Sequence, residues 1–422
     1  MYFEQITGDS HPSENTHVTP FSHAFCPIPD SFHSNVRDSL PKTADMRLLL
    51  TTLAALLSTL CHVQAQTRPA QHIVGAGSSA AAPIYRNWAS AYERATGVVV
   101  AYEAVGSSRG IQEIRRDAVS FGASDVALSA QESEELGLLT FPVAITGIAP
   151  VYNLPQVGDG QLRLTGDVLS RIFLGEITRW NAPEIAALNP DVPLPDAAIR
   201  VIVRADGSGT TYNFSDYLGK VSPAWKAVHA PRTHLNWPQH FIGVQRSSGV
   251  AQAVRQTPYA IAYVDHGYVR EHGLKAAMLQ NAQGEFVYPS VEAFRLALMH
   301  SSWASSGTYT ETLTQMPGKG AWPITMGTFI LLPKVARDPQ RTQAAMRFFT
   351  WAFLNGDMLV QQSHFVRLPN RVQAAAFKTM TLVRDNAGRP MEIMTLPCDW
   401  GGCPAGAEAR RQATFSTATP PM

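Results

Sequence analysis

The feature that most restricts the fold of this chain is a strand–turn–helix pattern that occurs three times, each time with a turn rich in Gly and Ser. The turns are Gly77-Ser78-Ser79, Gly106-Ser107-Ser108 and Gly207-Ser208-Gly209-Thr210. Each follows a short apolar run and precedes residues with helical spacing. This alternation is typical of an α/β protein with a parallel sheet, in which ligands bind at the carboxyl ends of the strands.

Residues around these turns predict where the elements begin and end. Pro83 stands where a helix would start, because proline is favoured at the first helical position, and Gly97 would end that helix. Strands are predicted over 71–76, 98–102, 119–124, 199–203, 260–264 and 328–332, and an apolar helix over 344–354. We interpret the prolines at 142, 150 and 155 as a separator between the first part of the chain and the next.

A segment near the N-terminus predicts export. A basic start at residues 46–47 precedes the apolar run 48–60 and the small-residue end Val63-Gln64-Ala65. These three parts describe a secretory signal peptide, so we expect residues 46–65 to be cleaved after Ala65. Residues 1–45 are then a mis-assigned upstream extension. A membrane-spanning helix would need ~20 apolar residues, which the run does not reach.

The cysteines are consistent with an exported protein. A lipoprotein anchored through Cys61 stays an alternative, although Leu60 is larger than the small residue normally found before a lipidated cysteine. Cys398 and Cys403 lie in the C-terminal tail, residues 386–422. In an oxidising compartment we expect this pair to close a small loop.

Charge and composition limit the possible partners. The 34 Lys and Arg nearly balance the 33 Asp and Glu, so the chain has no basic surface for nucleic acid or anionic membrane. An anion site must therefore be local. The 13 histidines show no metal-binding spacing, and we expect neither a metal nor an organic cofactor.

The three turns offer the chemistry of a local anion site. Unpaired backbone N–H groups and the positive end of a helix dipole favour an anion, and Ser or Thr hydroxyls add donors. Arg204, just before the third turn, can bind two oxygens of a tetrahedral anion, and Asp206 could hold its guanidinium from behind. One such turn alone would be an ordinary helix cap, but three with an arginine favour an anion site.

Two enzyme motifs overlap the same turns. Gly75-Ala-Gly77-Ser-Ser-Ala80, with Glu103 after the next strand, fits the dinucleotide pattern, but an exported chain meets little nicotinamide cofactor. Gly106-Ser-Ser108-Arg-Gly110 fits the nucleophile elbow of hydrolases. A secreted esterase that uses Ser108, with His234 or His266 as base, stays an alternative, although no His-Gly-Gly-Gly oxyanion segment is present.

Taken in order, these segments resemble the phosphate-binding proteins of ABC phosphate importers, and the likeness covers residues 71–375. It rests on Gly75-Ala-Gly-Ser-Ser79, Gly106-Ser-Ser-Arg-Gly110, Phe121-Gly-Ala-Ser-Asp125, Ile172 to Asn181, Arg204-Ala-Asp-Gly-Ser-Gly-Thr210, Tyr259-Ala-Ile-Ala-Tyr263 and Trp322-Pro-Ile-Thr325. The resemblance implies a type II, two-lobe periplasmic-binding-protein fold with a ligand cleft between lobes joined by two crossover segments. Lobe I would be 71–146 plus 321–385, and lobe II 147–320.

The resemblance also implies a role and a set of site residues. The expected protein is a non-enzymatic, monomeric receptor that binds inorganic phosphate in the periplasm and passes it to the permease and ATPase of the importer. A binding protein for another oxyanion stays possible. The donors would be Arg204, held by Asp206, together with Ser79, Ala80, Ser107, Ser108, Ser208, Gly209 and Thr210. Arg109 replaces a glycine of the family. Its side chain would either add a positive charge at the entrance of the ligand cleft or point to solvent.

Asp125 falls on the position that, in this family, accepts a hydrogen bond from the bound anion. A physical argument explains how a carboxylate there would select between anions. A carboxylate facing a tetrahedral dianion is repulsive unless the anion carries a proton to donate. Hydrogen phosphate has such a proton at neutral pH, whereas sulfate does not. Asp125 would therefore reject sulfate by leaving it in a buried contact between like charges.

Overall fold

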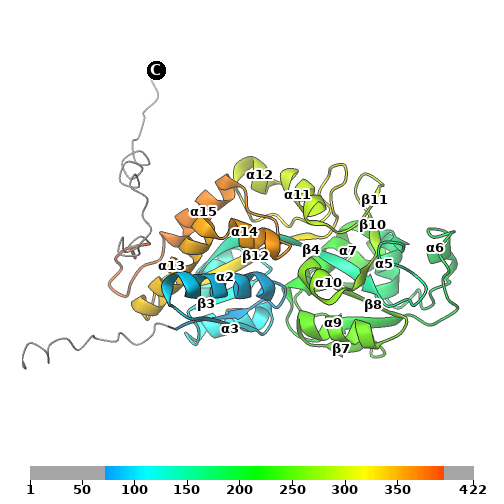
Figure 1. Cartoon of the computed structure of the whole chain (residues 1–422), viewed down its shortest axis with the longest axis horizontal. Coiled ribbons are helices and arrows are strands. Elements are labelled where there is room, and N and C mark those ends of the chain that lie inside the picture. The colour runs from blue at the N-terminus through cyan, green and yellow to red at the C-terminus, as the bar shows by residue number, and fades with distance from the viewer. Residues whose placement is uncertain (1–71, 394–422) are drawn as a thin grey trace, which may run out of the picture. The chain divides into compact units, whose positions relative to one another are not determined.

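The computed structural model describes residues 72–393. The expected upstream extension (1–45), the signal peptide (46–65) with Cys61, and the Cys398–Cys403 pair lie outside these residues. Within them, a nine-stranded mixed sheet has the order β2-β1-β3-β12-β4-β8-β6-β7, with β9 also paired to β4. The elements divide into two lobes along this sheet (Figure 1).

Lobe I contains the strands at the β2 end of the sheet and the helices that cover them. Its elements are β1 (Ile73–Gly77), α2 (Ala82–Thr96), β2 (Val100–Ala104), α3 (Ser107–Arg115), β3 (Phe121–Ser124), α4 (Ala130–Leu136), β12 (Thr325–Pro333), α13 (Pro339–Asn355), α14 (Asp357–Gln362) and α15 (Asn370–Met380). Strand β1 pairs in parallel with β2 and β3. Trp88 and Phe349 pack with Phe121 in the main core, whereas Ile114 of α3 packs with Leu331 in a separate cluster.

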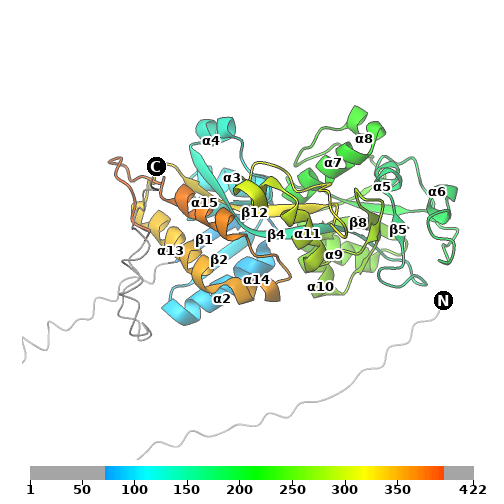
Figure 2. The ribbon, with the colours of Figure 1, turned by 90° about the horizontal axis from the view of Figure 1, so that it is seen from above.

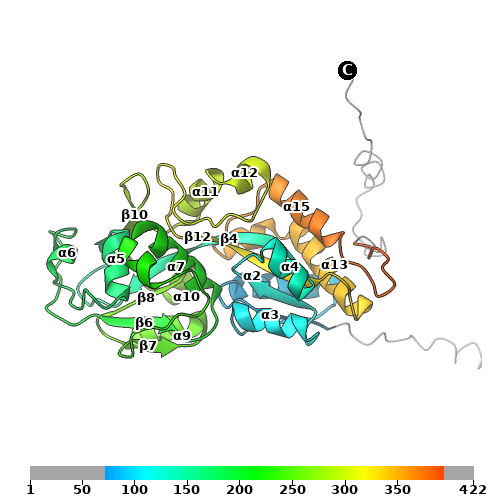
Figure 3. The same cartoon turned by 180° about the vertical axis from the view of Figure 1, so that it is seen from behind.

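Lobe II contains the strands at the other end of the sheet, together with a separate three-stranded sheet (Figure 3). Its elements are β5 (Arg163–Leu164), α5 (Gly166–Phe173), α6 (Pro183–Ala186), β6 (Arg200–Arg204), α7 (Gly209–Val221), α8 (Pro223–Val228), β7 (Ile242–Val244), α9 (Arg246–Gln256), β8 (Ala260–Asp265), α10 (His266–His272), β9 (Lys275–Ala276), β10 (Met278–Gln280) and β11 (Phe286–Val287). Strand β6 is parallel to β7 and β8.

A single long strand, β4 (Leu138–Tyr152), runs through both lobes (Figure 2). It pairs with β12 over 138–147 and with β8 over 148–152, both antiparallel. Next to it lie α11 (Val291–Met299), which contacts β4 and β12, and α12 (Ser302–Ser306), which contacts α15. The strand is buried along its whole length.

The interpretation of Pro142 and Pro150 as a separator was wrong, because both lie inside β4. Proline has no N–H for the ladder and is normally excluded from central strands. Pro142 is accommodated where the register with β12 shifts between Thr328 and Phe329, which is the kind of bulge that tolerates a missing donor.

The local predictions around the turns are confirmed. A proline lies in the first turn of α2, and Gly97 ends this helix with φ 71°. The strands predicted at 71–76, 98–102, 119–124, 199–203, 260–264 and 328–332 appear as β1, β2, β3, β6, β8 and β12, with ends shifted by a few residues. The apolar helix predicted over 344–354 lies within α13.

Candidate functional site

The Gly- and Ser-rich turns lie at the carboxyl ends of parallel strands and meet between the lobes. Lobe I supplies the turns after β1 and β2 and the residue after β3, and lobe II supplies the turn after β6. Ser107 Oγ of lobe I accepts a hydrogen bond from the Gly209 N–H of lobe II, at 3.1 Å. The Ser108 N–H donates to Gly207 O at 3.1 Å. The two lobes are therefore in direct contact at the predicted site.

Glycines make this close approach of the lobes possible. A Cβ on Gly207 would lie 2.4 Å from Ser108 Cβ, and one on Gly209 would lie 2.7 Å from Asp125 Cβ. Both distances are too short for carbon atoms that do not share a bond. The glycines of the third turn thus serve contact between the lobes as well as the start of α7.

Asp125 follows β3 and is almost completely buried, with 2% of its surface exposed. Its Oδ2 accepts a hydrogen bond from the Ser78 hydroxyl at 2.6 Å, and its backbone oxygen accepts one from Asn213 Nδ2 at 2.8 Å. Burial raises the pKa of this carboxyl to about 6, against the hydrogen bond from Ser78 and the charge of Arg204. Its Oδ1 is buried without a partner among the described residues.

Arg204 ends β6 and is also 2% exposed. Its Nε and Nη2 donate to the two carboxylate oxygens of Asp206 at 2.7 and 2.6 Å. Burial acts to raise the pKa of Asp206, but the bonds and charge of Arg204 outweigh it and hold this pKa below its usual value. Asp206 Oδ1 also accepts from the Arg246 N–H at 3.1 Å. The guanidinium is thus held in one orientation by a bidentate partner.

The remaining predicted residues fall into two groups: those whose polar atoms already form hydrogen bonds within the protein, and those whose polar atoms do not. Ser208 caps α7 by accepting from the Thr211 N–H, and the Ser108 hydroxyl donates to Thr233 Oγ1 at 3.0 Å. Thr210 Oγ1, in contrast, is buried without a partner in the described part of the chain. Such atoms are rare in folded proteins and are often explained by a ligand. Thr210 is therefore free to donate to an anion.

The first turn, from Ser78 to Ala80, is buried at the start of α2. Ser79 Oγ lies 3.0 Å from Ser247 Oγ of lobe II and accepts from the Ser247 N–H at 3.0 Å. Arg109, on the second turn, pairs instead with Glu113 one helical turn away, at 2.5 Å, and its side chain is 53% exposed.

Several residues at this site were not predicted from the sequence, among them Ser78, Thr233 and Ser247. Ser78 belongs to the first turn, so its position in a Gly-Ser-Ser run could have indicated it. Thr233 and Ser247 carry no motif, and they reach Ser108 and Ser79 only through the fold.

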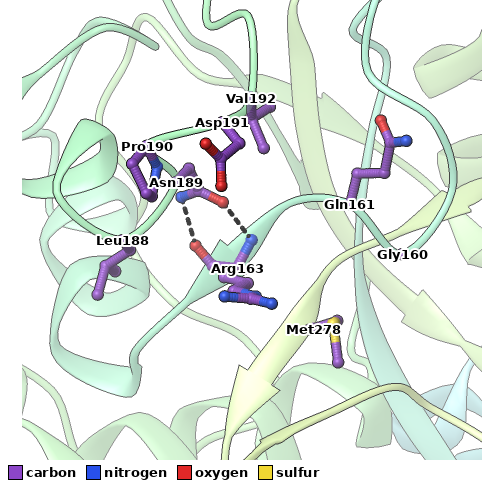
Figure 4. A pocket seen from close by; sticks show the side chains of 9 residues that line it. All are labelled: Gly160, Gln161, Arg163, Leu188, Asn189, Pro190, Asp191, Val192 and Met278. Carbon is purple, nitrogen blue, oxygen red and sulfur yellow. Dashed lines mark hydrogen bonds between the residues drawn. The ribbon is translucent and has the colours of Figure 1, made fainter.

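A hollow in lobe II does not share this chemistry. A cavity of about 370 Å³ in lobe II is lined by Arg163, Asn189 and Met278, among others (Figure 4). There the Asn189 side chain donates to Arg163 O at 2.9 Å and accepts from its N–H at 2.7 Å, so its polar atoms are occupied. A much smaller cavity, of about 60 Å³, lies beside Asp125 and is lined by Asn213.

Among residues 72–393, no group of three or more His, Cys, Asp or Glu is arranged to hold a metal ion. No helix in the same range is long and apolar enough to cross a bilayer.

The two-lobed sheet and the buried polar site between its lobes define a protein of the substrate-binding class, and a family model described as a PBP superfamily domain matches residues 62–355. The phosphate-binding protein PstS of Pasteurella multocida is 42% identical over 343 residues, which cover 81% of this chain and 99% of the relative. That of Haemophilus influenzae is 42% identical, with coverage of 74% and 92%. The chain belongs to this family of PstS phosphate-binding proteins.

A solved structure supports the same fold. The phosphate-binding protein from Stenotrophomonas maltophilia superposes with a TM-score of 0.57 at 18% identity, covering 72% of this chain and 92% of that protein. The expected fold class, a two-lobe α/β fold of the type II periplasmic binding proteins, is confirmed.

Proposed function

We propose that this protein binds inorganic phosphate between its lobes and delivers it to the permease and ATPase of an ABC phosphate importer. The observation that carries the proposal is Asp125, a buried carboxyl with one oxygen unpaired, beside a turn of donors. Such a group favours an anion that brings a proton, and hydrogen phosphate is one. The names of the relatives, phosphate-binding protein PstS, support the same ligand.

The donors that would complete the site come from both lobes. Arg204 supplies the positive charge, with Asp206 holding its guanidinium in place. Thr210 supplies a free hydroxyl, and the turns around Ser79, Ala80, Ser107, Ser108, Ser208 and Gly209 supply backbone and hydroxyl groups. Phosphate would bind as the lobes close over it.

We also propose that the protein acts in the periplasm and that it is a binding protein rather than an enzyme. The signal-peptide pattern at 46–65 supports release into the periplasm. The esterase alternative needs a histidine base at Ser108, but the Ser108 hydroxyl donates to Thr233. Of the two candidate bases, His234 is exposed and His266 packs against Phe294. These contacts favour a binding protein over a hydrolase.

Calorimetry with phosphate and sulfate tests the proposal on the purified protein and two variants. Wild type should bind phosphate with micromolar or tighter affinity and show no heat with sulfate. Asp125→Asn should begin to bind sulfate, because the like-charged contact is removed. Asp191→Asn, at an exposed carboxyl of lobe II, should behave as wild type. Absent phosphate binding, or equal binding of both anions by wild type, would refute the proposal.

A further inference from the structure

The Ser78 side chain lies at the site but has no role in the function proposed above. Ser78 follows the last residue of β1 and is 1% exposed. Its N–H donates to Ala123 O of β3 at 3.0 Å, and its carbonyl oxygen accepts from the Tyr102 hydroxyl of β2 at 2.7 Å. A Cβ on Gly77 would lie 2.0 Å from Ala123 O, so only glycine allows this approach of β1 to β3. Ser78 is therefore fixed beside the end of β3, which Asp125 follows.

The direction of the Ser78 hydrogen bond follows from what its hydroxyl can give and receive. A serine hydroxyl has one proton to donate and two lone pairs that accept. The Ala81 N–H donates to Ser78 Oγ at 3.3 Å and so occupies one lone pair. The hydroxyl proton goes to Asp125 Oδ2, at 2.6 Å. A bond this short is typical of a hydroxyl that donates to an ionised carboxylate.

This bond fixes which oxygen of Asp125 can meet an anion. Oδ2 is engaged by Ser78, whereas Oδ1 is buried without a partner among the described residues. The backbone of Asp125 is held separately, because its N–H donates to Ser107 Oγ at 3.3 Å and its oxygen accepts from Asn213 Nδ2 at 2.8 Å. With the backbone held, the Ser78 bond orients the side chain and leaves Oδ1 as its acceptor.

The same bond acts on the charge of Asp125. Burial raises the pKa of this carboxyl to about 6, and the Ser78 bond acts against burial, because a donated hydrogen bond stabilises the ionised form. An ionised carboxyl can only accept, so it takes the proton of hydrogen phosphate and repels sulfate. A protonated carboxyl could donate to sulfate, and the rejection of sulfate would be lost.

We propose that Ser78 is a positioning residue for anion selectivity: its hydroxyl keeps Asp125 ionised and oriented, with Oδ1 free to accept the proton of the bound phosphate. The inference rests on the proposed function. Both donors of Ser78, its N–H and its hydroxyl, are used within the protein, so Ser78 acts through Asp125 rather than on the anion. Loss of the hydroxyl should therefore change selectivity and its pH dependence more than phosphate affinity.

The pH dependence of sulfate binding separates this role from a general structural effect. Calorimetry measures sulfate and phosphate binding between about pH 5 and about pH 8. Wild type should bind sulfate only as the pH falls through about 6, where Asp125 takes up a proton. In Ser78→Ala the donor that lowers this pKa is absent, so the midpoint should rise by about one pH unit. Phosphate affinity near neutral pH should fall by at most about tenfold.

Other ionisable groups also face the Asp125 carboxyl, and they come from four elements. They are Arg204 of β6, Asp265 of β8, Tyr85 of α2 and Tyr102 of β2. The variants of Ser78 leave all four in place. A midpoint that moves between wild type and Ser78→Ala therefore reports the Ser78 hydroxyl.

Three variants serve as controls. Ser120→Ala removes another buried hydroxyl of lobe I, which accepts from the Val74 N–H at 3.1 Å at the opposite end of β3, and it should titrate as wild type. Ser78→Thr keeps the donor and should also titrate as wild type. Asp125→Asn should bind sulfate equally at every pH, and the addition of Ser78→Ala to it should create no midpoint, because the titrating group is absent.

The outcomes distinguish this inference from the proposed function. An unchanged midpoint in Ser78→Ala, no sulfate binding by this variant at any pH, or a midpoint in Ser78→Thr that moves equally would overturn the role of Ser78. If Ser78→Ala does not fold, Ser78→Cys has a weaker donor of similar size, and its midpoint should rise in the same way; an unchanged one again overturns the role. A wild-type protein that binds no phosphate would instead refute the proposed function itself.

Discussion

At the residue scale, two buried carboxyl groups, Asp125 and Asp265, lie close enough for the charge of one to raise the pKa of the other. Their surroundings nevertheless differ. Asp125 accepts a hydrogen bond from the Ser78 hydroxyl, and the positive charge of Arg204 lowers its pKa. Burial outweighs both and raises this pKa to about 6. Burial, together with the charge of Asp125, raises the pKa of Asp265 to about 8. At neutral pH the first is therefore mostly ionised and the second mostly protonated.

This difference predicts how stability depends on pH. The folded protein keeps the Asp265 proton up to about pH 8, whereas the unfolded chain releases it near 3.8. The free energy of unfolding of ligand-free wild type should thus fall as pH rises from about 4 to about 8, by at most ~1.4 kcal/mol per pH unit from this group. Asp265→Asn lacks the proton, so it should gain stability relative to wild type across this window.

Urea denaturation at about pH 5 and about pH 8, without phosphate, measures this difference. Asp191→Asn, at an exposed carboxyl, serves as the control and should follow the wild-type curve. A constant difference between Asp265→Asn and wild type at both pH values would show that Asp265 does not titrate in this way.

The site could be predicted from sequence only as far as local patterns reach. Ser107, Gly209 and Arg204 belong to turns whose residue types already indicate anion binding. Ser247, in contrast, lies 168 positions from Ser79, and nothing near it in the sequence suggests a contact. Its position depends on how α9 packs after the lobes meet, which short-range spacing does not encode.

At the element scale, the third turn predicts how closure can be blocked without unfolding. The three atoms nearest to a Cβ on Gly207 all belong to Ser108 of the other lobe, the first at 2.4 Å. Gly207→Ala should therefore leave ligand-free stability within about 0.5 kcal/mol of wild type. Closure, however, would require overpacking that costs ~1–3 kcal/mol, so phosphate affinity should fall roughly 10- to 100-fold.

Two matched variants check this explanation by calorimetry and thermal denaturation. Gly219→Ala lies in α7, where its Cβ would meet only Trp225 at 3.9 Å, an ordinary contact. It should bind phosphate as wild type. Ser108→Gly combined with Gly207→Ala removes the clashing Cβ and should recover part of the affinity. If the single Gly207→Ala variant binds as tightly as wild type, the lobes do not need this close approach.

Elements with strong local signals were predictable, and the one with conflicting signals was not. Helix α2 has a proline in its first turn and Gly97 at its end, and both ends were predicted. Strand β4 contains Pro142 and Pro150, which locally indicate a break. Its pairing with β12 and β8 on either side overrides that signal, because long-range ladders and burial stabilise the strand more than two missing donors destabilise it.

At the scale of the whole molecule, the described region has one main core that includes residues of both lobes. Trp88 and Phe349 of lobe I and Phe214 and Tyr263 of lobe II belong to the same buried cluster. The continuous strand β4 adds backbone pairing across the boundary. Two lobes coupled in this way should unfold as one cooperative unit rather than one after the other.

Phosphate should therefore raise the temperature of a single unfolding transition. A ligand held between both lobes binds the folded state alone, and at a concentration about 1,000 times its dissociation constant it stabilises by ~4 kcal/mol. For a protein of this size the shift is roughly 5–10 °C. Differential scanning calorimetry with phosphate and with equal sulfate measures it, and sulfate should leave the transition in place. Two transitions of which phosphate moves only one would mean that the ligand contacts a single lobe, because a site built from Asp125 and Arg204 must stabilise both.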